Sequence, residues 1–202
     1  QYMRNPIPTE GLMYHEFRTY QNIELPSGSK ANQRWCYVDT ADTGSDYLCA
    51  ICFINTPEML YVIDVLYTQL PMEKTEVMLA KMLTENSITE CLIESNNGGR
   101  QFARNVKRIT RATLHNFKTA INTFTQTKNK AARIFSNSAL VNSDVAFPEN
   151  WDKKWREFYN AITTYRKDNK RRAAHDDAPD ALTGVVEMHS RKAGRKKISL
   201  RN

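Results

Sequence analysis

Three acidic residues stand at the ends of predicted structural elements, where their side chains could share one site. Asp39 closes a predicted strand, Glu94 closes another, and Asp180 lies in the first turn of a predicted final helix. Each alone has an ordinary explanation, as a turn residue, a solvated strand end or an acid favoured by the positive end of a helix. If the two strands are neighbours and the helix packs on them, the three carboxylates meet at one edge of a sheet.

A carboxylate cluster of this kind is what hard divalent cations require. Mg²⁺ binds to proteins through one or two carboxylates together with water molecules and substrate phosphate. Two such ions about 3.5–4 Å apart can activate a water molecule and stabilise the departing oxygen. Capping alone does not require this combination of acids, so the pattern favours a metal-dependent phosphoryl-transfer site.

Hydrophobic patterning predicts the elements that position these acids. Residues 33–40, 47–55 and 59–66 are apolar and rich in β-branched and aromatic side chains, which predicts three strands. The short connections between them, including a polar hairpin-type turn at 41–46, favour an antiparallel meander. Residues 89–94 predict a fourth, short strand.

Helices are predicted in the chain both before and after this fourth strand. Residues 100–107 predict a basic helix after it, and residues 73–86 predict an amphipathic helix before it, whose apolar side carries Val77, Met78, Met82 and Leu83. The order of strand, helix and strand predicts a parallel crossover that joins the sheet.

The second half of the chain is less regular. Residues 112–125 predict one or two further strands, and residues 129–140 predict a helix. A later stripe at helical spacing predicts a core face rather than a base-stacking platform, and comprises Trp151, Trp155, Phe158, Tyr159 and Ile162. The final helix begins at about Ala178 and keeps the same spacing of apolar residues to His189.

The net charge of +7 is concentrated in the C-terminal tail. Six basic residues and no acid follow Ser190, so the rest of the chain is almost neutral. Other basic residues cluster at 100–111 and 153–172, and each cluster suits either phosphate contacts or a solvated helix face. For DNA binding we expect Arg100, Arg104, Lys107 and Arg108.

The spacing of the cysteines and the absence of common catalytic motifs argue against several other kinds of site. Cys49 and Cys52 form a C-x-x-C, but residues three apart on a strand point to opposite faces, and no second pair follows at zinc-finger spacing. We therefore expect buried, reduced cysteines. The sequence contains no P-loop, no H-E-x-x-H and no G-x-S-x-G motif.

Three segments carry a resemblance to a known family. They are residues 37–47 (YVDTADTGSDY), 93–100 (IESNNGGR) and 175–182 (HDDAPDAL). In this order they resemble the signature segments of the C-terminal nuclease domain of tailed-phage terminase large subunits. Residues 3–8 (MRNPIP), with a glycine and a tyrosine soon after, resemble the connector from that family's ATPase domain.

The resemblance implies a ribonuclease H-like α/β fold, with a mixed sheet of an antiparallel meander plus parallel strands, flanked by helices. It implies an endonuclease that cuts concatemeric double-stranded DNA with two Mg²⁺ or Mn²⁺ ions. By motif position, Asp39 and Glu94 are the first two metal ligands. The last segment supplies the third, for which we expect Asp180 with Asp177, because residues three apart share a helix face. Asp176 and Asp46 are reserve candidates for the metal site.

The resemblance also implies a domain plan and partners. Residues 1–32 are expected to connect to a missing N-terminal ATPase domain, residues 33–189 to form the nuclease domain, and residues 190–202 to form a basic, disordered tail. The expected partners are double-stranded DNA, the ATPase domain of the same subunit, the portal and the small terminase subunit.

The longest apolar run, residues 47–54, falls far short of the about 20 residues that cross a bilayer. We therefore expect a protein of the host cytoplasm without a membrane partner.

Two other classes remain open at this point. One is another ribonuclease H-like DNA enzyme, such as a transposase, an integrase or a junction resolvase, because dispersed acids suit all of them; residues 96–100 argue against it. The other is a non-catalytic DNA-binding docking module, which the basic tail supports. Metal-dependent plasmid cleavage separates an enzyme from the module, and transfer to a 3′-hydroxyl separates a transposase from a hydrolase.

Overall fold

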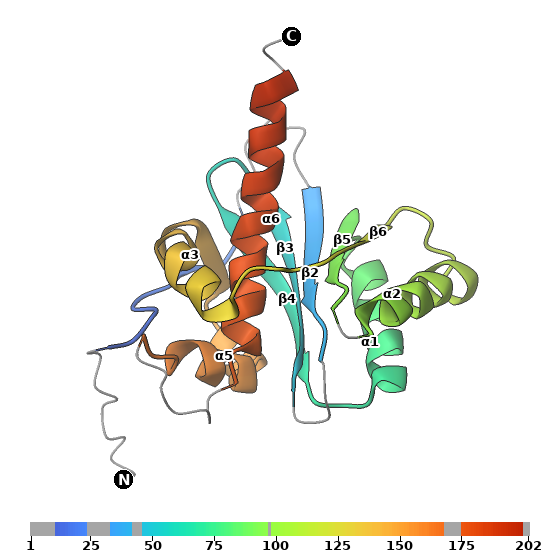
Figure 1. Ribbon diagram of the computed structural model, residues 1–202, viewed down its shortest axis with the longest axis horizontal. Coiled ribbons are helices and arrows are strands. Elements are labelled where there is room, and N and C mark those ends of the chain that lie inside the picture. Colours follow the sequence, from blue (N-terminus) through green and yellow to red (C-terminus); the bar gives the residue numbers. More distant parts are fainter. Residues whose placement is uncertain (1–10, 24–32, 42–45, 97, 168–174, 200–202) are drawn as a thin grey trace.

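The computed structural model describes residues 11–23, 33–41, 46–96, 98–167 and 175–199. A seven-stranded sheet lies at the centre, in the order β1-β7-β4-β3-β2-β5-β6, with helices on both faces (Figure 1). The strands are β1 (Arg18–Tyr20), β2 (Gln33–Asp39), β3 (Leu48–Asn55), β4 (Leu60–Thr68), β5 (Glu90–Glu94), β6 (Ala120–Phe124) and β7 (Val145–Pro148). The helices are α1 (Met72–Glu85), α2 (Gly99–Arg108), α3 (Lys130–Asp144), α4 (Trp151–Lys154), α5 (Arg156–Thr163) and α6 (Asp177–Ser199).

The sheet is mixed, as the sequence predicted. β2, β3 and β4 form the antiparallel meander, whereas β5 pairs in parallel with β2, and β6 pairs in parallel with β5. α1 makes the crossover from β4 to β5. The predicted turn at 41–46 falls largely outside the described residues, but β2 and β3 pair antiparallel on either side of it.

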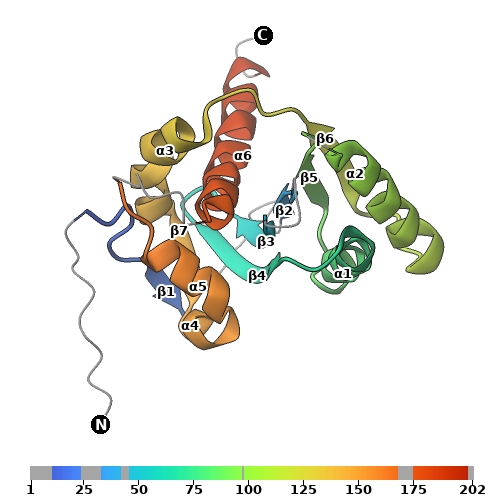
Figure 2. The same ribbon diagram turned by 60° about the horizontal axis from the view of Figure 1, so that its bottom comes forward.

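Each face of the sheet buries its own hydrophobic core. α3, α4, α5 and α6 cover one face, and α1 and α2 cover the other (Figure 2). Cys49 packs in the first core and Cys52 in the second, because alternate strand residues point to opposite faces. All four cysteines are buried and free, which confirms the prediction for them.

The apolar side predicted for α1 is correct for Met82 and Leu83, which are buried, and wrong for the other two residues. Val77 and Met78 are 39% and 37% exposed. In place of Val77 and Met78 the helix buries Leu79 and Ala80, together with the polar residues Thr75 and Glu76. Glu76 can be buried because it has a polar partner on the neighbouring helix: Asn105 of α2 donates a hydrogen bond to its carboxylate (2.9 Å). Hydrophobic spacing alone does not predict such a pair.

Residues 112–125 contain one strand, β6, in the described structure. The first part of that range is helical, because α2 passes directly into a π-helix over Ile109–Thr113. Residues 151–163 form the predicted stripe, but as two helices that meet at Trp155. Trp151, Phe158 and Ile162 are buried, which confirms a core face.

Described residues on both sides of 33–189 have regular structure. Leu12, Met13 and Tyr14, in the expected connector, are buried in the core, and β1 joins the sheet beside β7. The backbone of α6 is helical through Ser199, inside the segment for which the sequence predicted disorder. Within the described part of the chain, no helix combines the length and apolar character needed to cross a membrane.

A glycine lets α6 lie directly on the sheet. A Cβ atom at Gly184 would lie 2.1 Å from ring atoms of Tyr37 on β2. Nothing larger than glycine fits there unless the helix or the ring moves. The distance between α6 and β2 is therefore set by this contact.

We expect Gly184→Ala to lower the free energy of unfolding by about 1–3 kcal/mol, because the added methyl group overpacks the contact with Tyr37. Alanine in a helix interior is normally more favourable than glycine by about 1 kcal/mol, so the sign of the change distinguishes the two effects. Urea unfolding measures it. Ser190→Ala, on the exposed side of the same helix, is the control and should stay close to the parent; an equally stable Gly184→Ala would contradict the tight contact.

Candidate metal centre

The sheet brings two of the three predicted acids together. Asp39 is the last residue of β2 and Glu94 is the last residue of β5, and these parallel neighbours are in register through Val38 and Ile93. The two acids therefore leave the same edge of the sheet on the same face. That face is covered by α6, because Tyr37, two residues before Asp39, packs in the core that α6 shares.

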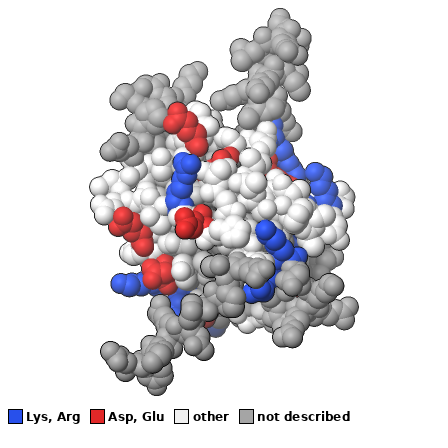
Figure 3. Space-filling view, turned by 90° about the vertical axis from the view of Figure 1, so that its left-hand side faces the viewer, with Lys and Arg blue, Asp and Glu red and all other residues white. Residues whose placement is uncertain are grey.

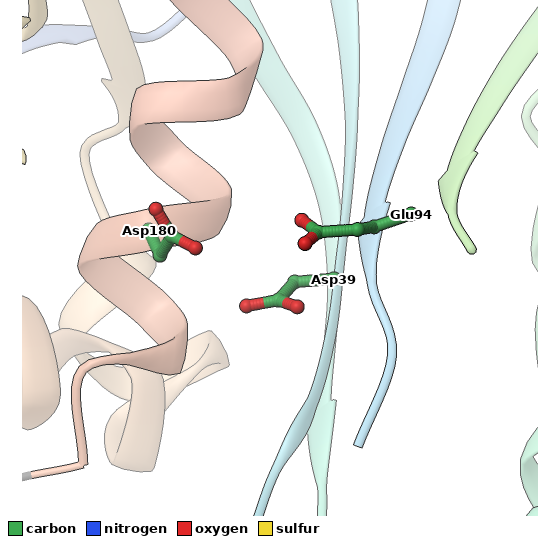
Figure 4. A group of neighbouring side chains, drawn as sticks. All are labelled: Asp39, Glu94 and Asp180. Atoms are coloured by element: carbon green, nitrogen blue, oxygen red, sulfur yellow. The ribbon is translucent and has the colours of Figure 1, made fainter. Parts of the chain in front are cut away.

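The third acid approaches from the helix. Asp180 lies in the first turn of α6 and faces the two strand ends (Figure 4). One carboxylate oxygen from each of Asp39, Glu94 and Asp180 lies within 4.8 Å of the others. The three residues are only 7%, 7% and 3% exposed. Asp39 and Glu94 line a hollow of about 260 Å³, whose other lining residues are also polar or charged.

Burial makes this cluster electrostatically costly. Desolvation raises the pKa of Asp39 well above its usual value, raises that of Glu94, and raises that of Asp180 to about 7. Repulsion from neighbouring carboxylates adds to all three shifts, and nearby cations oppose them. Additional positive charge in the hollow would therefore favour the ionised cluster.

The donor set fits a hard divalent cation. All three side chains offer carboxylate oxygens, which Mg²⁺ and Mn²⁺ accept as ligands. The Oδ2 atom of Asp39 is buried and receives no hydrogen bond from the described residues. Its nearest cation is the Lys130 ammonium at 3.4 Å, an ionic contact without hydrogen-bond geometry. A buried anionic oxygen of this kind suits a metal ligand.

Hydrogen bonds orient Glu94 within the group. Its Oε1 atom accepts from Asn96 Nδ2 (2.9 Å), and its Oε2 atom accepts from the Tyr37 hydroxyl (3.4 Å). The same Asn96 amide also donates to the Gln126 carbonyl (3.0 Å), which ties the end of β5 to the segment after β6. Gly99 allows the chain to turn closely here. A Cβ atom at this position would lie only 2.2 Å from the Glu94 carbonyl oxygen, so a larger residue would not fit.

Two basic residues of α3 complete the site, and neither was predicted from the sequence. Arg133 is 3% exposed, and its guanidinium contacts Asp180 Oδ1 at 2.8 Å and Glu187 Oε2 at 3.2 Å. Lys130 reaches the carboxylates from one turn earlier on the helix. The only sequence signal was their spacing of three residues, which places them on one helix face.

The other predicted acids also lie at the hollow. Asp177 accepts hydrogen bonds from the Tyr47 backbone N–H (3.1 Å) and from Lys130 Nζ (2.9 Å). Asp176 is more exposed and contacts Lys130 at 3.1 Å, and Asp46 lines the same space. None of these three belongs to the close group of oxygens that Asp39, Glu94 and Asp180 form among the described residues.

The predicted DNA-binding residues lie on α2, which begins just after Glu94. Arg100, Arg104 and Lys107 line a groove of about 610 Å³ between α2 and β6. Arg108 is exposed on the same helix but does not line the groove. By contrast, acidic and basic side chains of the described residues lie interspersed on the face at the left of Figure 1, as Figure 3 shows.

The chain resembles a known family in sequence and several solved proteins in structure. A family model described as the terminase RNaseH-like domain matches residues 36–189. No curated protein sequence matches the chain. The structure is similar to that of the human cytomegalovirus terminase nuclease domain, Mn soaked and inhibitor bound, with a TM-score of 0.59 and 12% identity over 85% of this chain and 89% of that one.

Two bacteriophage proteins have the same fold at lower similarity. The large terminase of a thermophilic bacteriophage has a TM-score of 0.53 and 10% identity, over 88% of this chain and 46% of that one. The nuclease domain of the large terminase of bacteriophage SPP1, with bound Mn, has a TM-score of 0.50 and 9% identity, over 91% and 99%. The ribonuclease H-like fold expected from the sequence is thereby confirmed.

We expect Arg133→Met to lower the free energy of unfolding by about 3–5 kcal/mol, because it leaves Asp180 and Glu187 without their buried cation. Urea unfolding of the metal-free protein is the measurement. Arg191→Met is the matched control, since Arg191 reaches the same Glu187 from the surface (3.7 Å, 49% exposed). Its loss should cost less than about 1 kcal/mol, and equal losses in the two variants would argue against a special role for Arg133.

Proposed function

Because the chain belongs to the family of terminase ribonuclease H-like domains, we propose that it is a metal-dependent endonuclease that cuts double-stranded DNA. The observation that carries the proposal is the group of buried carboxylates of Asp39, Glu94 and Asp180, whose oxygens lie within 4.8 Å of one another. Mn is present in the nuclease-domain structures of human cytomegalovirus and SPP1 that this chain resembles.

In this proposal the three carboxylates hold two Mg²⁺ or Mn²⁺ ions, with Asp177 as a further ligand from the same helix. Divalent ions in such a site activate a water molecule and stabilise the departing oxygen of a phosphodiester. The surrounding residues orient the ligands: Asn96 and Tyr37 hold Glu94, and Arg133 holds Asp180. Ligands whose rotamers are fixed in this way lose little entropy when they bind ions.

The groove between α2 and β6 is proposed to hold the DNA backbone. Arg100, Arg104 and Lys107 present three cations along it, and Asn122 and Thr123 of β6 add hydrogen-bonding groups. Such a lining suits phosphates, which carry no base sequence, so we expect cleavage with little base specificity. Because α2 starts soon after Glu94 in the chain, we propose that a strand in this groove would lead from its Arg100 end toward the carboxylates.

We further propose that the chain serves genome packaging by a tailed bacteriophage in the host cytoplasm, cutting concatemeric DNA. Its partners would be an ATPase domain of the same subunit, the portal and the small terminase subunit. A transposase or integrase is the second candidate, since its chemistry uses similar acids. Joining of a labelled 3′-hydroxyl end to a target duplex would favour that candidate, whereas hydrolysis alone favours the terminase nuclease.

We expect Asp39→Asn to reduce nicking of supercoiled plasmid by more than about 100-fold with Mg²⁺ or Mn²⁺ and no ATP. The variant keeps the shape of the side chain but loses the charge that holds cations, and even indirect supports of metal ligands typically contribute 10–100-fold. Its thermal midpoint without metal should equal or slightly exceed the parent's, because one buried charge is removed from a repulsive group.

The matched control is Asp152→Asn, a change of the same chemistry on an exposed residue of α4. It should cut like the parent. Glu94→Gln and Asp180→Asn should also lose cleavage, although Asp180→Asn will melt earlier because it breaks the pair with Arg133. An Asp39→Asn variant that cuts as fast as the parent and melts at the same temperature would refute the site.

A second prediction concerns the groove. Replacing Arg100, Arg104 and Lys107 together by glutamine should weaken DNA binding uniformly across unrelated duplexes. The slope of log K against log salt should become shallower by about 0.9 for each phosphate that the variant no longer neutralises. Fluorescence anisotropy over a range of salt concentrations measures this. Lys153→Gln, an exposed lysine of α4, is the control. An unchanged slope in the triple variant would exclude the groove as the DNA site.

A further inference from the structure

Lys130 is placed among more carboxylates than ion pairing requires. Its Nζ atom lies 2.9 Å from Asp177, 3.1 Å from Asp176, 3.4 Å from Asp39 and 3.9 Å from Asp180. These acids come from the end of β2 and from the start of α6, so one ammonium links the sheet to the helix. These contacts include two of the three residues that form the close oxygen group.

The two basic residues of α3 divide Asp180 between them. Arg133 contacts its Oδ1 atom and Lys130 approaches its Oδ2 atom. Arg133 has a side chain that is 2% exposed and is also held by Glu187, so it is locked behind the site. The side chain of Lys130 is 34% exposed and lines the hollow itself. Its long, flexible stem allows the ammonium to move toward solvent.

An ammonium in this position and a divalent ion need the same oxygens. Mg²⁺ binds carboxylate oxygens at about 2.0–2.1 Å, so an ion bound to Asp39 and Asp180 would lie within a few ångströms of Lys130 Nζ if the ammonium stayed in place. Like charges at such a distance repel strongly in a partly desolvated site. The ammonium and the ion cannot both keep all their contacts.

We propose that Lys130 is a built-in counter-cation that competes with divalent ions for the carboxylates of the metal centre. It holds the acids together in the metal-free protein and gives up its contacts with Asp39 and Asp180 as ions bind, while Asp176 and Asp177 provide an alternative position at the edge of the hollow. Metal affinity is thereby weaker than the carboxylates alone would give. This inference rests on the proposed metal-dependent function.

Isothermal titration with Mn²⁺, together with thermal melting, tests the competition. Lys130→Gln should bind Mn²⁺ about tenfold more tightly than the parent, because a competing charge a few ångströms away is removed. Its melting temperature without metal should fall, and saturating Mn²⁺ should restore most of the difference. Lys128→Gln is the matched control, since it removes the same charge from an exposed position two residues away. Lys130→Arg keeps the charge and should bind Mn²⁺ within a fewfold of the parent.

The outcomes separate this inference from the proposed function. If the parent binds Mn²⁺ and Lys130→Gln binds it equally or more weakly, the competition is overturned and the metal centre stands. The same conclusion follows if Lys128→Gln gains as much affinity as Lys130→Gln, because the effect would then be one of overall charge. If neither the parent nor Lys130→Gln binds Mn²⁺, the metal centre and the competition are both overturned.

Discussion

The burial of three neighbouring carboxylates is the constraint on which the rest of this structure depends. Asp39, Glu94 and Asp180 lie close together and are almost fully buried, so their charged forms are disfavoured both by desolvation and by one another. Two cations from a single helix offset this electrostatic cost: Arg133 contacts the group from behind, and Lys130 contacts it from the hollow. Divalent ions would complete the same charge balance from the solvent side.

The scaffold holds this group with short, rigid connections. Parallel pairing of β2 and β5 sets the separation of Asp39 and Glu94, and the close contact of Gly184 with Tyr37 sets the height of α6 and of Asp180 above the sheet. Tyr37 also reaches the Glu94 carboxylate, so one ring connects the packing of the helix to the orientation of a ligand. Sites built on strands and helices in this way are held more precisely than sites on loops.

The two faces of the sheet carry different charged groups. The face under α6 carries the acids and their counter-cations, whereas α2 on the opposite face supplies the basic groove together with β6. The two are close in the chain, since Glu94 is the last residue of β5 and Arg100 is the second residue of α2. In the proposed cleavage of DNA, the acids would hold the metal ions and the basic groove would attract the phosphates.

Local patterning was enough to predict the mixed sheet and its meander, and to place Asp39, Glu94 and Asp180 at the ends of elements, because strand ends and helix starts are encoded by residues close in sequence. It failed for the exposed Val77 and Met78, and for the core role of Leu12 to Tyr14, because those outcomes depend on which distant element packs there. Lys130 and Arg133 are the clearest case. Nothing near them in the chain marks them as site residues, and only the packing of α3 beside α6 places their charges against acids that are distant in the sequence.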